Sequence, residues 1–427
     1  MVITGIDKII PEGKIELFCH KSYFNSLEIS SLFPEIINLP QKSDFMIRII
    51  ADDKIPFLKG VLEPFADIKY FPGNKITHEV LKHADALIIR TRTKCTHELL
   101  DDTSVRFIGT ATIGFDHIDT QFCERKNIYW TNAPGCNSSS VQQYIAAALL
   151  KISSEFSFNL KNKSIGIIGV GNVGSKVEKF ARIMGMNILL CDPPRARNEG
   201  DANFTQLDNL LRKSDIVTVH VPLNVVGEDN TYHLFNETTF KKMKKRAWFL
   251  NSSRGEITET SALKNLLISE ISGGTVIDVW ENEPDIDPEL LAKAFIATPH
   301  IAGYSTDGKA NGTAMVVNSL CKFFNLPLEN WYPADVPLPF NPDITIDAKN
   351  KSDEEIMREA VFHTYNIEED DKKLRFSPAD FEKQRGNYRL RREFQAYNIR
   401  LINNKKSILK LLEALGFNVR SGSEPGN

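Results

Sequence analysis

Residues 163–194 carry the pattern that most constrains how this chain folds. An apolar run at residues 165–168 suits a buried parallel strand, and apolar residues at helical spacing follow it after a glycine-rich turn. The turn glycines, in GxGxxG spacing, are Gly169, Gly171 and Gly174. A second apolar run then ends at Asp192. This order of strand, turn, helix and strand predicts a βαβ unit, and with it an open α/β sheet.

The glycine spacing has a specific physical meaning. The first glycine permits a tight turn, the second lets backbone N–H groups approach a pyrophosphate, and the third lets helix and strand pack closely. The helix N-terminus adds partial positive charge for the phosphates. Asp192, 18 residues after Gly174, can accept hydrogen bonds from ribose hydroxyls and would repel a 2′-phosphate, which favours NAD over NADP. The residues expected to contact NAD here are Gly169, Gly171, Asn172, Val173, Gly174 and Asp192.

The composition is typical of a globular protein. The chain has 427 residues, 42% hydrophobic and 25% charged, with room for two or three domains. Its net charge of −3 gives no reason to expect a nucleic-acid or anionic-membrane surface. The six cysteines form no CxxC pair and show no metal-ligand spacing, so no metal is expected and a reducing cytoplasm fits best. No segment approaches the roughly 20 apolar residues of a membrane helix.

Several later apolar runs end in polar side chains. In an open parallel sheet, ligands bind outside the carboxyl ends of the strands, so these side chains are expected to face one crevice. They are His220, Arg254, Asp278, Glu283 and His300.

Arg254, Glu283 and His300 have a chemical use together. Hydride transfer from a secondary alcohol to nicotinamide needs a base for the hydroxyl proton, and histidine suits that role. A carboxylate on the other ring nitrogen fixes the tautomer and stabilises the imidazolium. A guanidinium holds a substrate carboxylate through two hydrogen bonds. The three residues are therefore the candidate catalytic set of a 2-hydroxy acid dehydrogenase.

Dense motifs between about residues 46 and 401 carry a family resemblance. They are "ADDKIPF", "TATIGFDHID", "APGCN", "GVGNVG", "NSSRGE", "IDVWENEP", "PHIAGYSTDGKANGT" and "RGNYRLRREF". In these motifs the chain resembles the D-isomer-specific 2-hydroxyacid dehydrogenases, and within them a branch that oxidises a phosphorylated acid in the pyridoxal phosphate pathway. The resemblance implies that Arg254 and Glu283 are catalytic and that His300 is the proton acceptor.

The same resemblance implies further contacts. Positions that touch the cofactor match Val221, Asp278 and Gly303. Relatives can carry a threonine where this chain has Val221, so a hydroxyl contact is not expected there. Positions that hold the phosphorylated substrate match Thr91, Thr112 and Tyr304. A homodimer formed through the C-terminal domain is also implied.

These patterns divide the chain into sections. We expect a Rossmann NAD-binding domain inserted in a flavodoxin-like substrate domain, plus a small α/β C-terminal dimerisation domain. A long helix starting in "NSSSVQQY" is expected to cross between the first two domains. The sections are 1–45, an extension that is not native if the chain begins at Met46; 46–145, the substrate domain; 146–299, the NAD-binding domain; 300–330, the return to the substrate domain; 331–403, the dimerisation domain; and 404–427, a tail containing a docked helix.

The basic loop "RTRTK", residues 90–94, raises a hypothesis about specificity. If the loop is extended, its three cations fall on one face and its two threonines on the other, because side chains alternate along a strand. A phosphate dianion binds both cations and hydroxyl donors. We therefore hypothesise that this loop selects phosphorylated acids, with Arg92 as the residue to test.

Other interpretations stay open. His117 is expected to be structural, holding the loop that carries Thr112, and His220 to border the cofactor. Residues 382–400 contain six basic and two acidic residues, a net charge of +4, which fits a nucleic-acid surface or a dimer interface. The resemblance favours the dimer and no nucleic acid. The alternative functions are oxidation of another acid, such as 3-phosphoglycerate, and an NAD(H)-sensing corepressor.

Overall fold

The computed structural model describes residues 46–269, 272–403 and 406–420. Two compact units divide the chain at Met46, and the elements below belong to the second unit, Ile47–Asn427. The extension expected at residues 1–45 lies outside the described residues.

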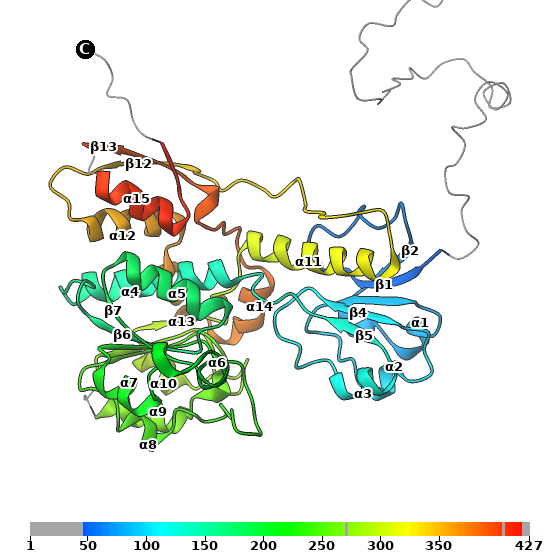
Figure 1. Ribbon diagram of the computed structural model, residues 1–427, viewed down its shortest axis with the longest axis horizontal. Coiled ribbons are helices and arrows are strands. Elements are labelled where there is room, and N and C mark those ends of the chain that lie inside the picture. Colours follow the sequence, from blue (N-terminus) through cyan, green and yellow to red (C-terminus); the bar gives the residue numbers. More distant parts are fainter. Residues whose placement is uncertain (1–45, 270–271, 404–405, 421–427) are drawn as a thin grey trace, which may run out of the picture. The chain divides into compact units, whose positions relative to one another are not determined.

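The first domain is built on a five-stranded parallel sheet in the order β2-β1-β3-β4-β5 (Figure 1). Its strands are β1 (Arg48–Asp52), β2 (Asp67–Phe71), β3 (Ala86–Ile89), β4 (Phe107–Thr110) and β5 (Tyr129–Thr131). Its short helices are α1 (His78–Leu81), α2 (His97–Leu100) and α3 (Thr120–Arg125). The chain returns to this sheet through α11 (Thr306–Phe324), whose Val316, Val317 and Leu320 share a core with Ile49 and Phe107.

The second domain holds a six-stranded parallel sheet in the order β11-β10-β9-β8-β6-β7. Its strands are β6 (Ser164–Ile168), β7 (Asn187–Cys191), β8 (Ile216–Val219), β9 (Trp248–Asn251), β10 (Gly274–Ile277) and β11 (Ile296–Ala297). The helices are α4 (Ser138–Glu155), α5 (Asn172–Ile183), α6 (Pro193–Glu199), α7 (Leu207–Lys213), α8 (Glu237–Phe240), α9 (Thr260–Ile268) and α10 (Pro288–Lys293). Residues of α4 and α5 pack on one face of the sheet and residues of α7 to α10 on the other, which gives two separate cores.

The order of strands fixes where a ligand can bind. Strand β6 lies between β7 and β8, and all three run parallel, so the chain leaves β6 in one direction and later returns to its other side. Such a switch point opens a crevice at the carboxyl ends of the strands. The glycine turn follows β6 directly, as the sequence predicts.

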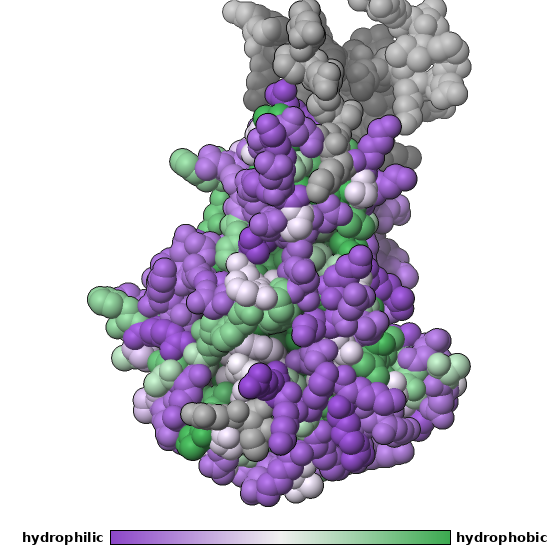
Figure 2. All heavy atoms as spheres, turned by 90° about the vertical axis from the view of Figure 1, so that its left-hand side faces the viewer, coloured by the Kyte–Doolittle hydropathy of each residue, from purple (hydrophilic) through white to green (hydrophobic). Residues whose placement is uncertain are grey.

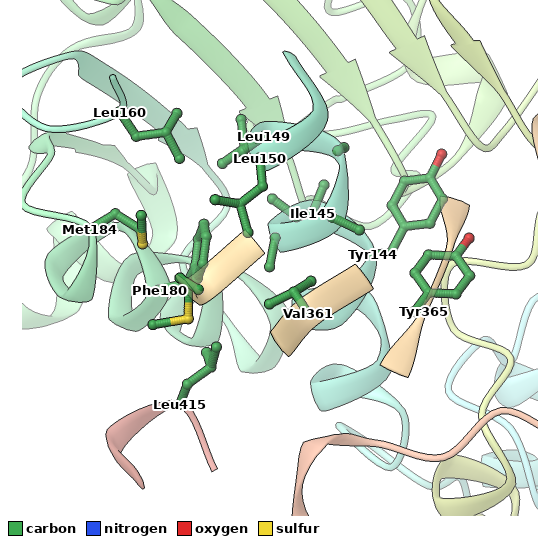
Figure 3. Packing of buried hydrophobic residues seen from close by; sticks show 14 of the residues in the cluster. Tyr144, Ile145, Leu149, Leu150, Leu160, Phe180, Met184, Val361, Tyr365 and Leu415 are labelled. Atoms are coloured by element: carbon green, nitrogen blue, oxygen red, sulfur yellow. The ribbon is translucent and has the colours of Figure 1, made fainter. Parts of the chain in front are cut away.

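Helix α4 is the buried centre of the larger core. Its side chains include Tyr144, Ile145, Leu149 and Leu150, all at most 1% exposed. Figure 3 shows these residues packed with side chains from other elements, namely Leu160, Phe180, Met184, Val361, Tyr365 and Leu415. The C-terminal elements therefore share one core with the helices beside the nucleotide sheet.

The C-terminal domain is a three-stranded parallel sheet in the order β12-β13-β14. Its strands are β12 (Asp343–Asp347), β13 (Asn398–Ile402) and β14 (Asn418–Arg420), and its helices are α12 (Asp353–Thr364), α13 (Ile367–Phe376), α14 (Phe381–Gly386) and α15 (Lys406–Leu415). Short 3-10 turns elsewhere in the chain are Gly73–Lys75, Asp201–Asn203, Gly255–Ile257, Pro378–Asp380 and Phe394–Ala396.

The predicted boundary at residue 403 falls inside this C-terminal domain. Helix α15 buries Ile408, Leu412 and Leu415, as expected of a docked helix, and β14 then pairs with β13. The sequence prediction missed β14 because three residues give no measurable alternation. The segment 404–420 is thus part of the domain as far as it is described, and residues 421–427 lie outside the described part of the chain.

Figure 2 shows one face of the molecule, where hydrophilic residues predominate and hydrophobic ones lie in groups between them. Among the described helices, none combines the length and apolar character needed to cross a bilayer.

Candidate active site

The three glycines after β6 have three different environments. Gly169 has φ of +81°, a conformation that side chains disfavour. A Cβ on Gly174 would lie 2.0 Å from the carbonyl oxygen of Gly169, so the helix can pack this closely only with glycine. A Cβ on Gly171 would meet no atom within 4 Å, which leaves open space at the start of α5. Tight turn, close packing and open backbone are what a bound pyrophosphate requires.

Asp192 is tied to the glycine turn. It follows β7 and caps α6, because its Oδ1 accepts a hydrogen bond from the Arg195 amide at 3.1 Å. Its Oδ2 accepts another from the Val170 amide at 2.7 Å. Arg195 also donates to the Val170 carbonyl at 2.7 Å and pairs with Glu199. The Asp192 carboxylate therefore has a fixed place beside the glycine turn. Sequence analysis did not single out Arg195; the feature that could have indicated it is its i, i+4 spacing to Glu199.

His300 and Glu283 form a hydrogen-bonded pair. His300 lies three residues beyond β11 with φ of +55°, and its Nδ1 is 2.7 Å from Oε2 of Glu283. The other carboxylate oxygen accepts from the Trp280 amide at 2.8 Å. Burial raises the pKa of Glu283, but the hydrogen bond and charge of His300 outweigh burial and hold that pKa below its ordinary value. An ionised Glu283 accepts the Nδ1 proton, so Nε2 is the ring nitrogen left for a substrate.

Asp278, at the end of β10, holds the loop that carries His300. The carboxylate is 1% exposed, and its Oδ1 accepts from Thr298 Oγ1 at 2.6 Å and from the Ile301 amide at 2.8 Å. Its Oδ2 accepts from the Ala302 amide at 2.8 Å. Burial raises the pKa of Asp278, although the His300 charge and these donors oppose that shift. The structure thus gives Asp278 a positioning role, and its contact with the cofactor stays a prediction.

Arg254 follows β9 and reaches toward the loop after β4. Its Nη1 donates to the Ser253 carbonyl at 2.8 Å, and its Nη2 is 3.8 Å from Asp116 Oδ2. A Cβ on Gly114 would lie 2.6 Å from the same Nη2. The guanidinium is one-third exposed and has donors left for a ligand. The structure therefore brings Arg254 beside the loop that carries Thr112.

Thr112 and His117 belong to one hydrogen-bonded group. The hydroxyl of Thr112 donates to the Gly114 carbonyl at 3.0 Å and lies 2.8 Å from the Thr110 hydroxyl. His117 Nε2 is 3.1 Å from that same Thr110 hydroxyl. Burial lowers the pKa of His117. These contacts support the structural role expected of His117.

His220 is also held by its own strand. Its Nε2 lies 2.9 Å from the Thr218 hydroxyl, and burial lowers its pKa to about 3, so the ring is neutral at ordinary pH. The next residue, Val221, packs against the glycine turn, with its Cγ1 2.8 Å from where a Cβ on Gly169 would stand. Val221 thus lies beside the glycine turn, and its contact with the cofactor stays a prediction.

The extended form assumed for "RTRTK" is wrong, because residues 91–93 form a turn. Thr93 points into the protein, is 2% exposed and donates to the Gly73 carbonyl at 2.9 Å. Thr91 is exposed, so the two threonines do not share a face. Arg92 pairs with Glu382 of α14 at 3.2 Å. Side-chain alternation along a strand does not apply where the backbone turns.

Gly303 and Tyr304 lie together after His300. A Cβ on Gly303 would stand 2.2 Å from Asn137 Nδ2, so a side chain here would have to displace the Asn137 amide. The Tyr304 ring packs edge-on against Tyr388, and two cations flank it. Those cations are Lys309 and Arg385, which sequence analysis did not single out. Lys309 lies within the motif "PHIAGYSTDGKANGT", and Arg385 is the first residue of the motif "RGNYRLRREF".

Three consecutive residues of the C-terminal domain, 391–393, form hydrogen bonds with the loop that follows His300. Sequence analysis did not predict these contacts. The Arg391 carbonyl accepts from the Thr306 amide at 2.8 Å, and the Arg391 guanidinium donates to the Ala302 carbonyl. Ser305 Oγ donates to Glu393 at 2.7 Å. Arg392 binds both oxygens of Asp307, at 2.8 and 2.9 Å. Residues 391–393 thus hold the segment that follows His300 in place.

The chain is similar to a known family and to several named proteins. Residues 140–302 match the family model of the D-isomer specific 2-hydroxyacid dehydrogenase NAD binding domain, and residues 337–416 match a domain of unknown function. An erythronate-4-phosphate dehydrogenase of Bacteroides thetaiotaomicron is 49% identical over 359 residues, 83% of this chain and 99% of that protein. One from Proteus mirabilis is 38% identical over 375 residues, 87% and 99% of the two chains.

Solved structures show the same fold. A D-lactate dehydrogenase from Aquifex aeolicus, complexed with NAD and lactic acid, has a TM-score of 0.54 and 25% identity over 65% of this chain and 95% of that one. A 3-phosphoglycerate dehydrogenase from Entamoeba histolytica with bound NAD+ has a TM-score of 0.56 and 23% identity over 67% and 98%.

The chain therefore belongs to the D-isomer-specific 2-hydroxyacid dehydrogenases and is an NAD-dependent oxidoreductase of that family. Within the family it falls in the branch of the erythronate-4-phosphate dehydrogenases. The predicted fold class, with its Rossmann domain and parallel sheets, is confirmed, and so is the predicted use of NAD.

Proposed function

We propose that this protein oxidises 4-phospho-D-erythronate to (R)-3-hydroxy-2-oxo-4-phosphooxybutanoate with NAD, a step of pyridoxal 5′-phosphate (vitamin B6) biosynthesis. The observation that carries the proposal is the pair of His300 Nδ1 and Glu283 Oε2 at 2.7 Å, in a chain nearly half identical to a named erythronate-4-phosphate dehydrogenase. The pair leaves one ring nitrogen for the substrate hydroxyl, and Arg254 supplies a cation for its carboxylate.

The chemistry follows from the donors and acceptors of these three residues. Arg254 binds the C1 carboxylate and so orients the C2 carbon. His300 Nε2 takes the proton of the C2 hydroxyl as the carbonyl forms, and Glu283 stabilises the resulting imidazolium across the 2.7 Å hydrogen bond. Bound NAD supplies the acceptor for the hydride that leaves C2. The protein ends the step with one extra proton on His300, which passes to solvent.

Residues of the second domain would hold most of the cofactor. The open backbone at Gly171 and the first turn of α5 would bind the pyrophosphate, while Asp192 would bind the ribose hydroxyls. Val221, Asp278 and Gly303 would line the nicotinamide end. Thr91, Thr112 and Tyr304 would contact the substrate. In this assignment the sections 46–145 and 300–330 form the substrate domain.

We also propose a homodimer formed through the C-terminal domain. This domain exposes large apolar side chains that a monomer leaves in water, with Phe340 96% and Phe376 92% exposed. Leu338 and Leu390 add to them at 72% and 47%. Light scattering at micromolar concentration should give twice the monomer mass of 48.2 kDa. A mass of one chain would refute the dimer.

The place of action is proposed to be the cytoplasm. All five cysteines in the described part of the chain are free and buried, which suits a reducing compartment. Fractionation of the native cells, followed by detection of the protein, tests this assignment; recovery from a secreted fraction would contradict it.

A steady-state assay tests the reaction itself. NADH formation is followed with 4-phospho-D-erythronate, D-3-phosphoglycerate and D-glycerate in parallel, for the wild type and for His300→Ala. Companion reactions with a 2-oxo acid are read by product formation, so that bound cofactor is reoxidised. We expect turnover of the first substrate only, lost without His300. Turnover of phosphoglycerate instead would overturn the substrate, and NAD binding without turnover would favour the corepressor.

A further inference from the structure

Cations from two distant segments flank Tyr304. Lys309 lies in the first turn of α11, and its Nζ is 5.5 Å from the centre of the Tyr304 ring. Arg385 lies in α14 of the C-terminal domain, and its guanidinium carbon is 5.8 Å from the same ring. Arg90 follows β3 directly and acts on Lys309 electrostatically. Burial lowers the pKa of Lys309, and the charges of Arg90 and Arg391 lower it further.

Among the described residues, acidic side chains satisfy these cations only in part. Lys309 forms no ion pair or side-chain hydrogen bond there, and the Arg90 side chain donates to the Lys54 carbonyl at 3.3 Å. Arg385 binds Glu382 through Nη1, but its Nε is buried without a hydrogen-bond partner. Mutual repulsion of partly buried cations is costly unless an anion joins them.

The acidic groups nearby are already engaged. Glu283 is bound to His300, and Glu382 is shared by Arg92 and Arg385. Arg391 is a cation of the same region, but its guanidinium is bound to Ser140 and Ala302, so its role is structural. The remaining positive charge around Tyr304 therefore calls for an anion from outside the chain.

We propose that Lys309 and Arg385 form the subsite for the substrate phosphate, so that the C-terminal domain completes the active site. The proposal rests on the proposed function, in which the substrate carries a phosphate two carbons from the reacting C2. A phosphate dianion offers three strong acceptor oxygens and binds fixed cations well. Tyr304 lies four residues after His300, which brings the subsite to the reacting end. The subsite replaces Arg92, whose side chain is 68% exposed and paired with Glu382.

Paired substrates isolate the phosphate contact. Lys309→Ala and Arg385→Ala are compared with the wild type on 4-phospho-D-erythronate and on D-erythronate. Loss of one charge-assisted hydrogen bond lowers kcat/KM about 10- to 100-fold, and we expect this for the phosphorylated acid only. For D-erythronate the change should stay below about threefold, because the reacting carbons are untouched. Lys309→Arg, which keeps the charge, should retain more activity than Lys309→Ala.

Matched controls come from the same helices. Lys322→Ala changes an exposed lysine of α11, and Lys383→Ala changes an exposed lysine of α14; both should leave kcat/KM unchanged for either acid. NADH binding by fluorescence confirms that each variant is folded. Calorimetry with inorganic phosphate gives a readout apart from turnover: the enzyme with NADH should bind phosphate at least about tenfold more tightly than Lys309→Ala does.

The outcomes separate the two proposals. Equal losses for both acids, or unchanged phosphate binding in Lys309→Ala and Arg385→Ala, would overturn the subsite while the reaction stands. If the wild type instead oxidises another phosphorylated 2-hydroxy acid, the proposed substrate fails, and that acid and its unphosphorylated form then test the subsite in the same way. A wild type that does not distinguish phosphorylated from unphosphorylated acids would refute the subsite outright.

Discussion

Replacing Glu283 by glutamine tests the central pair of the site. Unit charges 2.7 Å apart attract by about 6 kcal/mol at an effective dielectric constant of about 20. Both side chains are mostly buried, 29% exposed for His300 and 19% for Glu283, and desolvation offsets roughly half of that attraction. About 3 kcal/mol is then left to stabilise the imidazolium in the transition state. Since about 1.4 kcal/mol is a factor of ten in rate, Glu283→Gln should lower kcat about 100-fold.

The same loop supplies a matched control. Glu281 pairs with His233 at 2.6 Å, and its other carboxylate oxygen accepts from the Thr260 amide. Glu281→Gln thus removes the same charge from a second histidine–glutamate pair two residues away. Both variants are assayed for kcat and KM with the phosphorylated acid, and for the Kd of NADH by fluorescence. We expect an intact NADH Kd in both and a large loss of kcat only in Glu283→Gln.

Two results would refute this reasoning. If Glu283→Gln keeps kcat within about threefold of the wild type, the carboxylate does not stabilise the proton acceptor. If Glu281→Gln loses as much kcat as Glu283→Gln, the effect is one of general loop integrity rather than of charge beside His300.

Three further predictions follow from the described geometry. Gly174→Ala should lower Tm, because its Cβ would lie 2.0 Å from a carbonyl oxygen, whereas Gly171→Ala should keep Tm and weaken NAD binding; equal Tm values in thermal denaturation would contradict this. Asp192→Ala should lower kcat/KM for NAD about tenfold and reduce the NAD to NADP preference, as steady-state kinetics with both cofactors would reveal. Burial raises the pKa of Glu283, but the hydrogen bond and the charge of His300 together outweigh burial, so this pKa lies below its ordinary value in the folded protein. The ionised carboxylate therefore stabilises the fold fully above the unfolded pKa of about 4.3, and this stabilisation is lost as the pH falls through the lower folded pKa. The Tm difference between wild type and Glu283→Gln should therefore shrink on acidification, and a constant difference would argue against it.

Much of the site could be predicted because its signals are local. The glycine turn and Asp192 belong to one continuous βαβ unit, and their spacing alone fixes which backbone groups face a pyrophosphate. Glu283 and His300 each follow a strand, and parallel strands bring their carboxyl ends to one edge of the sheet. Neither inference needs knowledge of a distant contact.

Other features could not be predicted from the sequence, for equally physical reasons. The loop at residues 90–94 turns because Thr93 finds a buried carbonyl at Gly73, a partner twenty residues away. Strand β14 is too short to show alternation and exists because β13 offers it an edge. In both cases the deciding hydrogen bonds join segments whose approach depends on the whole fold.

The sequence by itself determined the nucleotide fold, the cofactor and the candidate catalytic set, because each depends on residue spacing within one element or at the end of one strand. The tertiary structure decided what surrounds that set. Only folding brings Arg385 to Tyr304 and residues 391–393 to the loop after His300, across about 80 to 90 positions of chain. Contacts of that separation leave no periodic signal, since nothing in the local backbone relates the two segments until both are packed.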